Sequence, residues 1–143
     1  MKIIEEPLYK KIIKSVPILC VDLIISYNEK YLLIKRKQNP LKNKWWVPGG
    51  RVLIGERVED AVGRKLYEEL SISKSDSFKL IGFYEDFFDV SSFGSHFYHT
   101  FSMVFKLELI DLPDVITDKS ISGWMLNNNL PKRFESKLEL INV

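Results

Sequence analysis

The sequence predicts one α/β (α+β) domain over residues 1–143, with helices packed on the faces of a mixed β-sheet. Its length of 143 residues fits a single domain with a single core. Hydrophobic residues make up 45% of the chain and charged residues 28%, which is typical of a globular protein. The apolar patterns predict the order helix, hairpin, short strand, helix, two strands, strand and helix, which favours a mixed sheet.

The charge and cysteine content exclude several classes of protein. The 21 basic and 19 acidic residues are interspersed, so no basic patch predicts a nucleic-acid partner. Cys20 is the only cysteine, which rules out an intramolecular disulfide. We find no secretory leader and no apolar run of bilayer length, so we expect no membrane partner and a cytoplasmic location.

The N-terminal part predicts a helix followed by a hairpin. Residues 5–14 have Pro7 in the first turn, acids before bases, and apolar residues on one side, as in a short amphipathic helix. The apolar runs at 16–27 and 30–38 predict two strands joined by Asn28 and Glu29, the first strand being buried on both faces.

The middle of the chain predicts a strand, a turn and a helix. A short strand at 45–47 ends in a Pro-Gly-Gly turn at 48–50. Residues 57–70 predict a helix, because apolar residues recur every four positions and form one stripe: Val58, Val62, Leu66 and Leu70. Trp45 and Trp46 alternate in direction, so we expect one in the core and the other free to stack on a base or a sugar.

The C-terminal half predicts three strands and a last helix. The strands at 78–90 and 96–110 are separated by a Ser/Gly loop, and the second alternates regularly between apolar and polar residues. A loop at 111–122 precedes a short strand at 123–126. Residues 130–140 predict a terminal helix.

The acidic end of the central helix has two readings. Glu68 and Glu69, close to a strand-turn-helix junction, can hold a divalent cation through hard oxygen ligands, with a glycine carbonyl as a further ligand. A phosphate-bearing substrate would then be bound through the metal. In the alternative reading, Arg64 with Glu68 and Lys65 with Glu69 are ion pairs one turn apart on a solvated helix.

The spacing from the glycine turn favours the metal reading. Gly50 is followed by five residues and Glu56, then by seven residues and the run Arg64, Lys65, Leu66, Tyr67, Glu68, Glu69, Leu70, Ser71 and Ile72. This segment resembles the Nudix box at seven positions: Gly50, Glu56, Arg64, Leu66, Glu68, Glu69 and Ile72. The resemblance implies a Nudix-type α/β/α sandwich, and the Mg²⁺- or Mn²⁺-dependent hydrolysis of a nucleoside diphosphate linked to another group.

Two positions depart from the Nudix pattern. Ser71 stands where the box has glycine, and Lys65 stands where it has a metal-binding glutamate. A lysine there competes with a second cation, so we expect fewer metal ions. The branch of GDP-mannose mannosyl hydrolases also lacks this glutamate, uses one magnesium ion and attacks the sugar carbon. The N-terminal half ("VPILCVDLII", "YLLIKRKQNP", "WWVPGGRV") is similar to that branch, which implies a homodimer with the helix at 5–14 in its interface.

The resemblance also implies roles for individual residues. Those that bind the nucleotide sugar and its diphosphate are Asp22, Arg36 and Arg51. Those with a catalytic role are Arg64, Glu68 and Glu69. The metal ligands are Glu68, Glu69 and the carbonyl of Gly50.

The general base is missing from its place in the resemblance. In the mannosyl hydrolases it is a histidine in the loop before the last strand, and the loop at 111–122 has none. Its titratable residues are Asp111, Asp114, Asp118 and Lys119, and an aspartate can serve as the base if burial raises its pKa. His99 lies in phase with Phe97 and Phe101, which predicts a core histidine bonded to backbone, although that branch has a histidine in this strand too.

Three functions therefore stay open. The first is a magnesium-dependent hydrolase of a nucleotide sugar, converting GDP-mannose and water to GDP and mannose. The second is a pyrophosphatase that cleaves the phosphoanhydride with water activated by the metal and Glu68. The third is a nucleotide-sugar-binding module without catalysis, since Lys65 replaces the glutamate and the histidine is absent.

Overall fold

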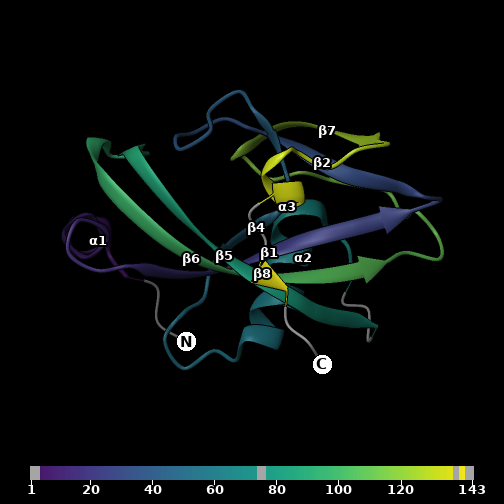
Figure 1. The fold of residues 1–143 in the computed structure, drawn as a ribbon, viewed down its shortest axis with the longest axis horizontal. Helices are drawn as coiled ribbons and strands as arrows, with labels where there is room; N and C mark the ends of the chain where they lie inside the picture. Colours follow the sequence, from purple (N-terminus) through teal and green to yellow (C-terminus); the bar gives the residue numbers. More distant parts are fainter. Residues whose placement is uncertain (1–3, 74–76, 137–138, 141–143) are drawn as a thin grey trace.

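The computed structural model of the protein describes residues 4–73, 77–136 and 139–140. Its elements (Figure 1) are α1 (Glu6–Ile13), β1 (Ile18–Tyr27), β2 (Lys30–Arg36), β3 (Trp45–Trp46), β4 (Gly49–Arg51), α2 (Val58–Leu70), β5 (Phe78–Ser91), β6 (Gly94–Glu108), β7 (Ile121–Asn127), α3 (Arg133–Ser136) and β8 (Glu139–Leu140). Within these residues no helix is long and apolar enough to span a membrane.

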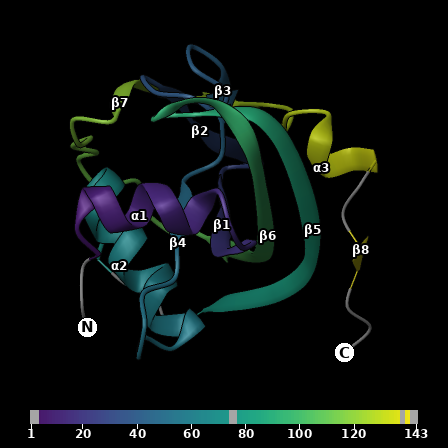
Figure 2. The same ribbon diagram turned by 90° about the vertical axis from the view of Figure 1, so that its left-hand side faces the viewer.

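The strands that the structure describes form one mixed sheet. Its main order is β3-β2-β1-β6-β5-β8, with β4 added to β1 and β7 added to β2. β1 and β6 run parallel, and the other pairs are antiparallel. β5 and β6 are long and strongly curved, and they wrap around one side of the molecule (Figure 2). A mixed sheet with few helices confirms the predicted fold class.

The hairpin of β1 and β2 opens away from its turn. Asn28 and Glu29 have φ values of 48° and 63°, as the two-residue type I′ turn requires, which confirms the predicted hairpin. The strands pair next to this turn, where Tyr27 faces Lys30. Further along, β1 pairs with β4, whereas β2 pairs with β3 and β7. The divergence leaves a gap in the sheet at the end of the strands remote from the turn.

Two apolar clusters cover the faces of β1. Val21 and Leu23 belong to the cluster under α2, whereas Ile24 belongs to the cluster that contains Phe134 of α3. Because successive residues of a strand point to opposite faces, α2 and α3 lie on opposite sides of the sheet. Both faces of the middle of β1 are thus buried, as the sequence predicts. The predicted stripe of α2 is confirmed by the burial of Val62, Leu66 and Leu70.

The predicted C-terminal helix is wrong in its extent. Within 130–140 the helix spans Arg133–Ser136, and Glu139–Leu140 forms a strand that pairs with β5. Residues 137–138 lie outside the described residues. β5 is otherwise a sheet edge at Gly82 and Phe83, and a paired strand satisfies the backbone groups of that edge.

The predicted Pro-Gly-Gly turn is also corrected. Gly49 and Gly50 belong to β4 and pair with β1. A Cβ at Gly49 would lie 2.3 Å from Oδ1 of Asp22 and 2.4 Å from the carbonyl oxygen of Val21. A Cβ at Gly50 would lie 2.6 Å from Cε of Lys65. Gly49 needs glycine because the backbone of β1 approaches closely, whereas Gly50 is approached by the flexible end of a side chain; neither requirement comes from a turn.

Candidate functional site

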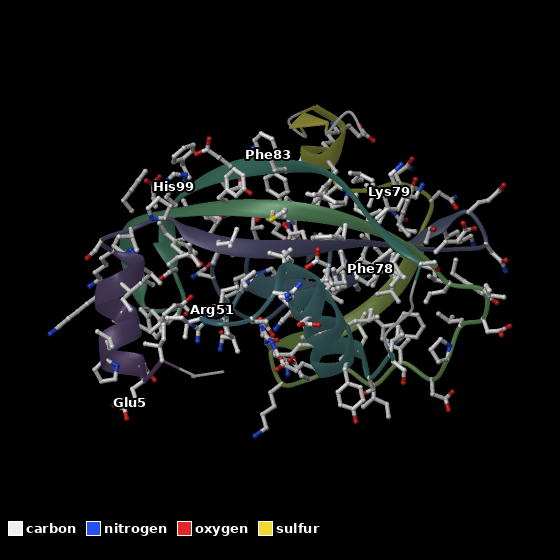
Figure 3. All side chains as sticks on the ribbon, turned by 90° about the horizontal axis from the view of Figure 1, so that it is seen from below. Glu5, Arg51, Phe78, Lys79, Phe83 and His99 are labelled. Carbon is white, nitrogen blue, oxygen red and sulfur yellow. The ribbon has the colours of Figure 1, made fainter. Side chains whose placement is uncertain are left out.

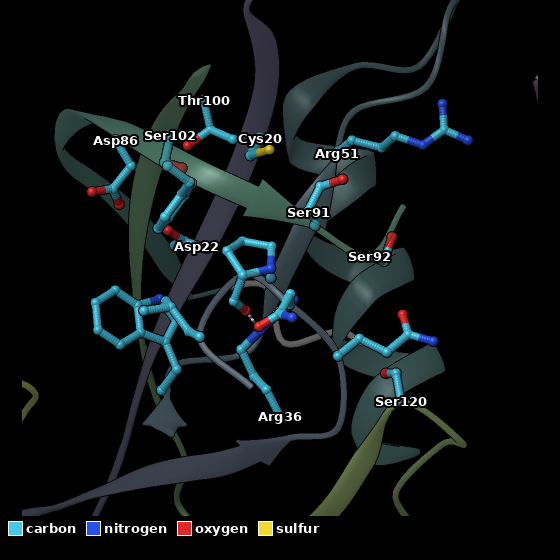
Figure 4. Close-up of a pocket in the computed structure, with 18 of the residues that line it drawn as sticks. Cys20, Asp22, Arg36, Arg51, Asp86, Ser91, Ser92, Thr100, Ser102 and Ser120 are labelled. Carbon is cyan, nitrogen blue, oxygen red and sulfur yellow. Dashed lines mark hydrogen bonds between the residues drawn. The ribbon is translucent and has the colours of Figure 1, made fainter. Parts of the chain in front are cut away.

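A cleft of about 290 Å³ occupies the gap between β1 and β2. It is lined by residues of α1, β1, β4, α2, β5 and β6 and of the segment after β2. Of the predicted site residues, it brings together Asp22, Arg36, Gly50, Arg51 and Glu69. Figure 4 shows Asp22, Asp86, Ser102 and Thr100 on one side of this pocket, with Arg36 and Arg51 apart from them.

Glu69 provides a buried carboxylate at the cleft. The residue is 5% exposed, and its Oε2 accepts a hydrogen bond from the backbone N–H of Gly49 at 3.0 Å. Burial disfavours the charged form and raises the pKa of Glu69 to about 7, although the Lys65 ammonium and the Gly49 N–H act in the opposite direction. A carboxylate with this pKa exchanges a proton near neutral pH.

The register of β4 bears on which glycine carbonyl faces Glu69. The Leu23 N–H donates to the Pro48 carbonyl at 2.8 Å, so this is a hydrogen-bonded position of the β1–β4 ladder. Such positions alternate in antiparallel pairs, so Gly50 turns its carbonyl toward β1 and Gly49 turns its carbonyl away. The sequence assigns the metal-binding carbonyl to Gly50, whereas the register favours Gly49, whose N–H already contacts Glu69.

Arg64 ties α2 to the segments around it and does not line the cleft. Its Nε lies 2.7 Å from Oε2 of Glu56, and its Nη1 lies 3.1 Å from Oε2 of Glu68. Its Nη2 also donates to the Arg51 carbonyl at 2.9 Å. The hydrogen bond from Arg64 lowers the pKa of Glu56, whose side chain is 1% exposed. These contacts position β4 against α2, and a catalytic role of Arg64 stays a prediction.

Glu68 does not line the cleft, and its predicted role as a metal ligand stays a prediction. Its side chain is 46% exposed and pairs with Arg64 and with Lys65, the latter at 3.3 Å. The ion pairs expected in the alternative reading of this helix are therefore present: Arg64 with Glu68, and Lys65 with Glu69 at 3.5 Å. They coexist with the burial of Glu69, so ion pairing and a site role do not exclude each other here.

Asp22 has the buried partners that its place in an apolar strand demands. It is 8% exposed, and it accepts hydrogen bonds from the Tyr84 and Ser102 hydroxyls. Burial raises the pKa of Asp22 to about 6, and both hydroxyls oppose this rise. Sequence reasoning missed Tyr84 and Ser102. The polar alternation of Tyr98, Thr100 and Ser102 on β6 was a signal for the latter.

Two arginines supply positive charge to the cleft. The Arg51 guanidinium carbon lies 4.3 Å from the ring centroid of Tyr9 on α1. Figure 3 shows Arg51 in the space between α1 and α2. Nε of Arg36 donates to the Pro40 carbonyl at 2.8 Å, which holds this side chain against the segment after β2. Such guanidinium groups can bind phosphate oxygens.

His99 lies away from the cleft. Its Nε2 lies 2.7 Å from Oε2 of Glu85, and its ring stacks on Phe87 with centroids 4.4 Å apart. The partner is thus a carboxylate, so the predicted backbone-bonded core histidine is wrong. The face that carries His99 is opposite the one that carries Thr100 and Ser102, which line the cleft.

Of the aspartates in the loop at 111–122, Asp118 acts electrostatically on Glu69. Its charge is among the causes that raise the pKa of Glu69, whereas Asp111 and Asp114 are exposed. Oδ1 of Asp118 accepts hydrogen bonds from the N–H and the hydroxyl of Ser120, at 2.8 and 2.6 Å. Ser120 itself lines the cleft.

The donor set fits one divalent cation better than several. Among the described residues, no group of three or more His, Cys, Asp or Glu side chains can hold a metal. Glu69 offers one carboxylate ligand, and the Gly49 carbonyl, which the register turns away from β1, offers a second oxygen. Mg²⁺ accepts such a partial set, because it completes its shell with water and substrate oxygens.

A sequence model of the NUDIX domain matches residues 17–137. The chain belongs to the Nudix family. The Nudix domain is 34% identical over 104 residues, 72% of this chain, to the low-salt glycan biosynthesis protein Agl8 of Haloferax volcanii, and covers 66% of that protein. It is 41% identical over 118 residues, 81% of this chain, to the ADP-ribose pyrophosphatase of Methanocaldococcus jannaschii, and again covers 66% of that protein. The chain thus spans just under two thirds of both curated relatives.

Solved structures agree on the fold of this Nudix domain. The MutT protein of Methanosarcina mazei Go1 superposes with a TM-score of 0.65 at 22% identity, over 84% of this chain and 89% of that one. At this identity the likeness concerns the fold alone. The Nudix box resemblance is therefore confirmed at the level of family and fold.

Proposed function

We propose that this Nudix protein is a Mg²⁺- or Mn²⁺-dependent hydrolase of a nucleotide sugar, with GDP-mannose as the reference substrate and GDP and mannose as products. The observation that carries this proposal is the buried carboxylate of Glu69 in a cleft that also holds Asp22, Arg36 and Arg51. These groups can bind a diphosphate through a metal ion and guanidinium groups, together with the hydroxyls of the attached sugar.

The residues of the cleft divide the work of binding. Arg36 and Arg51 meet the charge of the diphosphate, and Arg51 is oriented by its stacking on Tyr9. Asp22 accepts hydrogen bonds from hydroxyls of the sugar, because its carboxylate is fixed by Tyr84. Glu69 and the Gly49 carbonyl hold the metal ion. When bound, the ion neutralises the diphosphate and makes it a better leaving group.

Asp118 is our candidate for the general base. It precedes β7, in the loop where the mannosyl hydrolase branch has its histidine, and its charge reaches Glu69. The two hydrogen bonds from Ser120 fix the orientation of its carboxylate. Attack of water on the sugar carbon would transfer a proton to this carboxylate.

Cleavage of the phosphoanhydride is the second candidate reaction. It is favoured by the 41% identity to a protein named ADP-ribose pyrophosphatase. In this reaction Glu68 would help to position water for attack on phosphorus, and the products would be a sugar phosphate and a nucleoside monophosphate. The side chain of Glu68 is 46% exposed, so its carboxylate is accessible to water.

Product analysis in ¹⁸O-labelled water tests the proposal. GDP-mannose and ADP-ribose are each incubated with the protein and Mg²⁺, and the products are identified by mass spectrometry. We expect GDP and mannose, with the label in mannose. Mannose 1-phosphate and GMP, with the label on phosphate, would move the protein to the pyrophosphatases. Tight binding without turnover of any nucleoside diphosphate derivative would establish a binding module instead.

A matched pair of variants tests the assignment of Glu69. We expect Glu69→Gln to lower turnover by about 100-fold or more. Loss of a residue that only hydrogen-bonds to a metal ligand usually has a smaller effect. Glu68→Gln should have a smaller effect, because Glu68 is half exposed and contacts basic side chains. Equal losses in the two variants, or full activity of Glu69→Gln, would contradict the assignment.

A further inference from the structure

Lys65 lies where a metal-binding glutamate stands in the Nudix box, and its side chain is unusually buried for a lysine. The side chain is 15% exposed and lines the cleft. Nζ lies 3.3 Å from Oε2 of Glu68 and 3.5 Å from Oε1 of Glu69. A lysine on a solvated helix face would extend its ammonium into water. This one is directed toward the two carboxylates instead.

The absence of a side chain at Gly50 leaves room for the side chain of Lys65. A Cβ at Gly50 would lie 2.6 Å from Cε and 3.1 Å from Nζ of Lys65. The lysine stem therefore passes against the bare backbone of β4, and the ammonium ends between β4 and the carboxylates of α2. A divalent ion shared by Glu68 and Glu69 would need the same space, and the positive charge of Lys65 repels it.

We propose that the Lys65 ammonium is a built-in cation of the diphosphate site, which takes the place of a second divalent ion and donates a hydrogen bond to a phosphate oxygen of the substrate. This inference rests on the proposed function of the cleft. An ammonium has three N–H donors; Glu68 accepts a hydrogen bond from one of them, and Glu69 is an ion-pair partner at 3.5 Å. A remaining N–H serves the anion in the cleft.

The replacement has a chemical consequence for the bond that is cleaved. An ammonium neutralises phosphate charge and gives a hydrogen bond, but it does not position water for attack on phosphorus as a metal ion does. Lys65 is therefore suited to stabilise a departing nucleoside diphosphate. This role agrees with cleavage at the sugar carbon.

Counting bound metal ions tests the first half of the inference. Mn²⁺ is titrated into the metal-free protein, and free Mn²⁺ is followed by electron paramagnetic resonance. We expect one ion in the wild type and in Lys65→Gln, and two or more in Lys65→Glu, which restores a ligand. Two or more ions in the wild type, or a single ion in Lys65→Glu, would overturn the claim that Lys65 takes the place of a second ion. Lys79→Gln, a change at an exposed lysine of β5, is the control.

Binding of inorganic pyrophosphate tests the second half. Calorimetry in the presence of a chelator measures affinity without a metal ion and without turnover. We expect Lys65→Gln to weaken binding by about 10- to 100-fold, as for a lost hydrogen bond to a charged group, and Lys79→Gln to bind like the wild type. Unchanged affinity in Lys65→Gln, with folding verified by circular dichroism, would overturn this inference alone. No binding by the wild type in the presence of the chelator would overturn this inference, and no binding with Mg²⁺ present would also overturn the diphosphate site itself.

Discussion

Glu69 is a residue on which a proton and a metal ion compete. Its carboxyl group is buried, receives one backbone N–H, and has a pKa of about 7. A divalent cation binds the ionised carboxylate, so the metal must displace the proton at acidic pH. The affinity for the metal is thereby linked to pH in the neutral range.

We predict that the Mn²⁺ affinity of the protein rises with pH up to about 7 and then levels off. Below that pKa the ionised fraction of Glu69 grows tenfold per pH unit, and the affinity should follow it. Titrations at several values between about pH 5.5 and 8.5 would measure this slope. Glu69→Gln should bind weakly at every pH. A wild-type affinity that does not change between about pH 5.5 and 7 would refute the linkage.

β4 and α2 form the element pair that holds the site together. β4 is three residues long, and two of them are glycines that bring its backbone close to β1 on one side and to Lys65 on the other. Arg64 adds its hydrogen bond to the carbonyl of Arg51. The strand thus carries no apolar anchor of its own within its bounds, and its place depends on these close contacts.

The two glycines should differ in their tolerance of a methyl group. In Gly49→Ala the new Cβ meets the backbone carbonyl of Val21, which cannot move without disturbing β1, so we expect a loss of about 1–3 kcal/mol in the free energy of unfolding. In Gly50→Ala the Cβ meets the flexible end of Lys65, so stability should change less. Urea denaturation of both variants compares them, and equal losses would contradict this reading of β4.

The elements differ in how far the sequence determines them. α2 is predictable because its apolar stripe is local, and the first hairpin because two β-rich runs flank a short link that begins with Asn28, a residue type that tolerates positive φ. Asp22 could be predicted to need a partner, but not to find Tyr84, since parallel pairing of β1 with β6 and the bulges of β5 leave no local pattern. The terminal helix failed because pairing at the edge of β5 overrode local helix propensity.

At the scale of the whole molecule, some of the exposed apolar side chains lie on α1 and on the β5–β6 hairpin. Leu8 is 55% exposed and Val16 is 51% exposed, at and after α1. On the outer face of the β5–β6 hairpin, where Figure 3 labels Phe83 and His99, Phe87 is 60% exposed and Phe97 is 62% exposed. Because α1 also contacts the cleft through Tyr9, an interface on this helix would be coupled to the site.

We propose that the protein is a homodimer with α1 in its interface, as the family resemblance implies. Light scattering after size-exclusion chromatography should give the mass of two chains. Leu8→Glu and Val16→Glu should shift the protein to one chain, because a buried unpaired charge opposes association. Ile110→Glu, at a residue that is 92% exposed, is the control. A wild type with the mass of one chain would rule out the dimer.

The parallel pairing of β1 with β6 also governs when the cleft can form. Ile18 pairs with Thr100 and Ser26 with Glu108. The chain between the two strands, which contains β4 and α2, therefore forms one long loop that this pairing closes. Closing so long a loop is entropically costly and slow. During synthesis, α2 therefore leaves the ribosome before β6, which completes the cleft. The protein thus becomes able to bind its ligand among the last steps of folding.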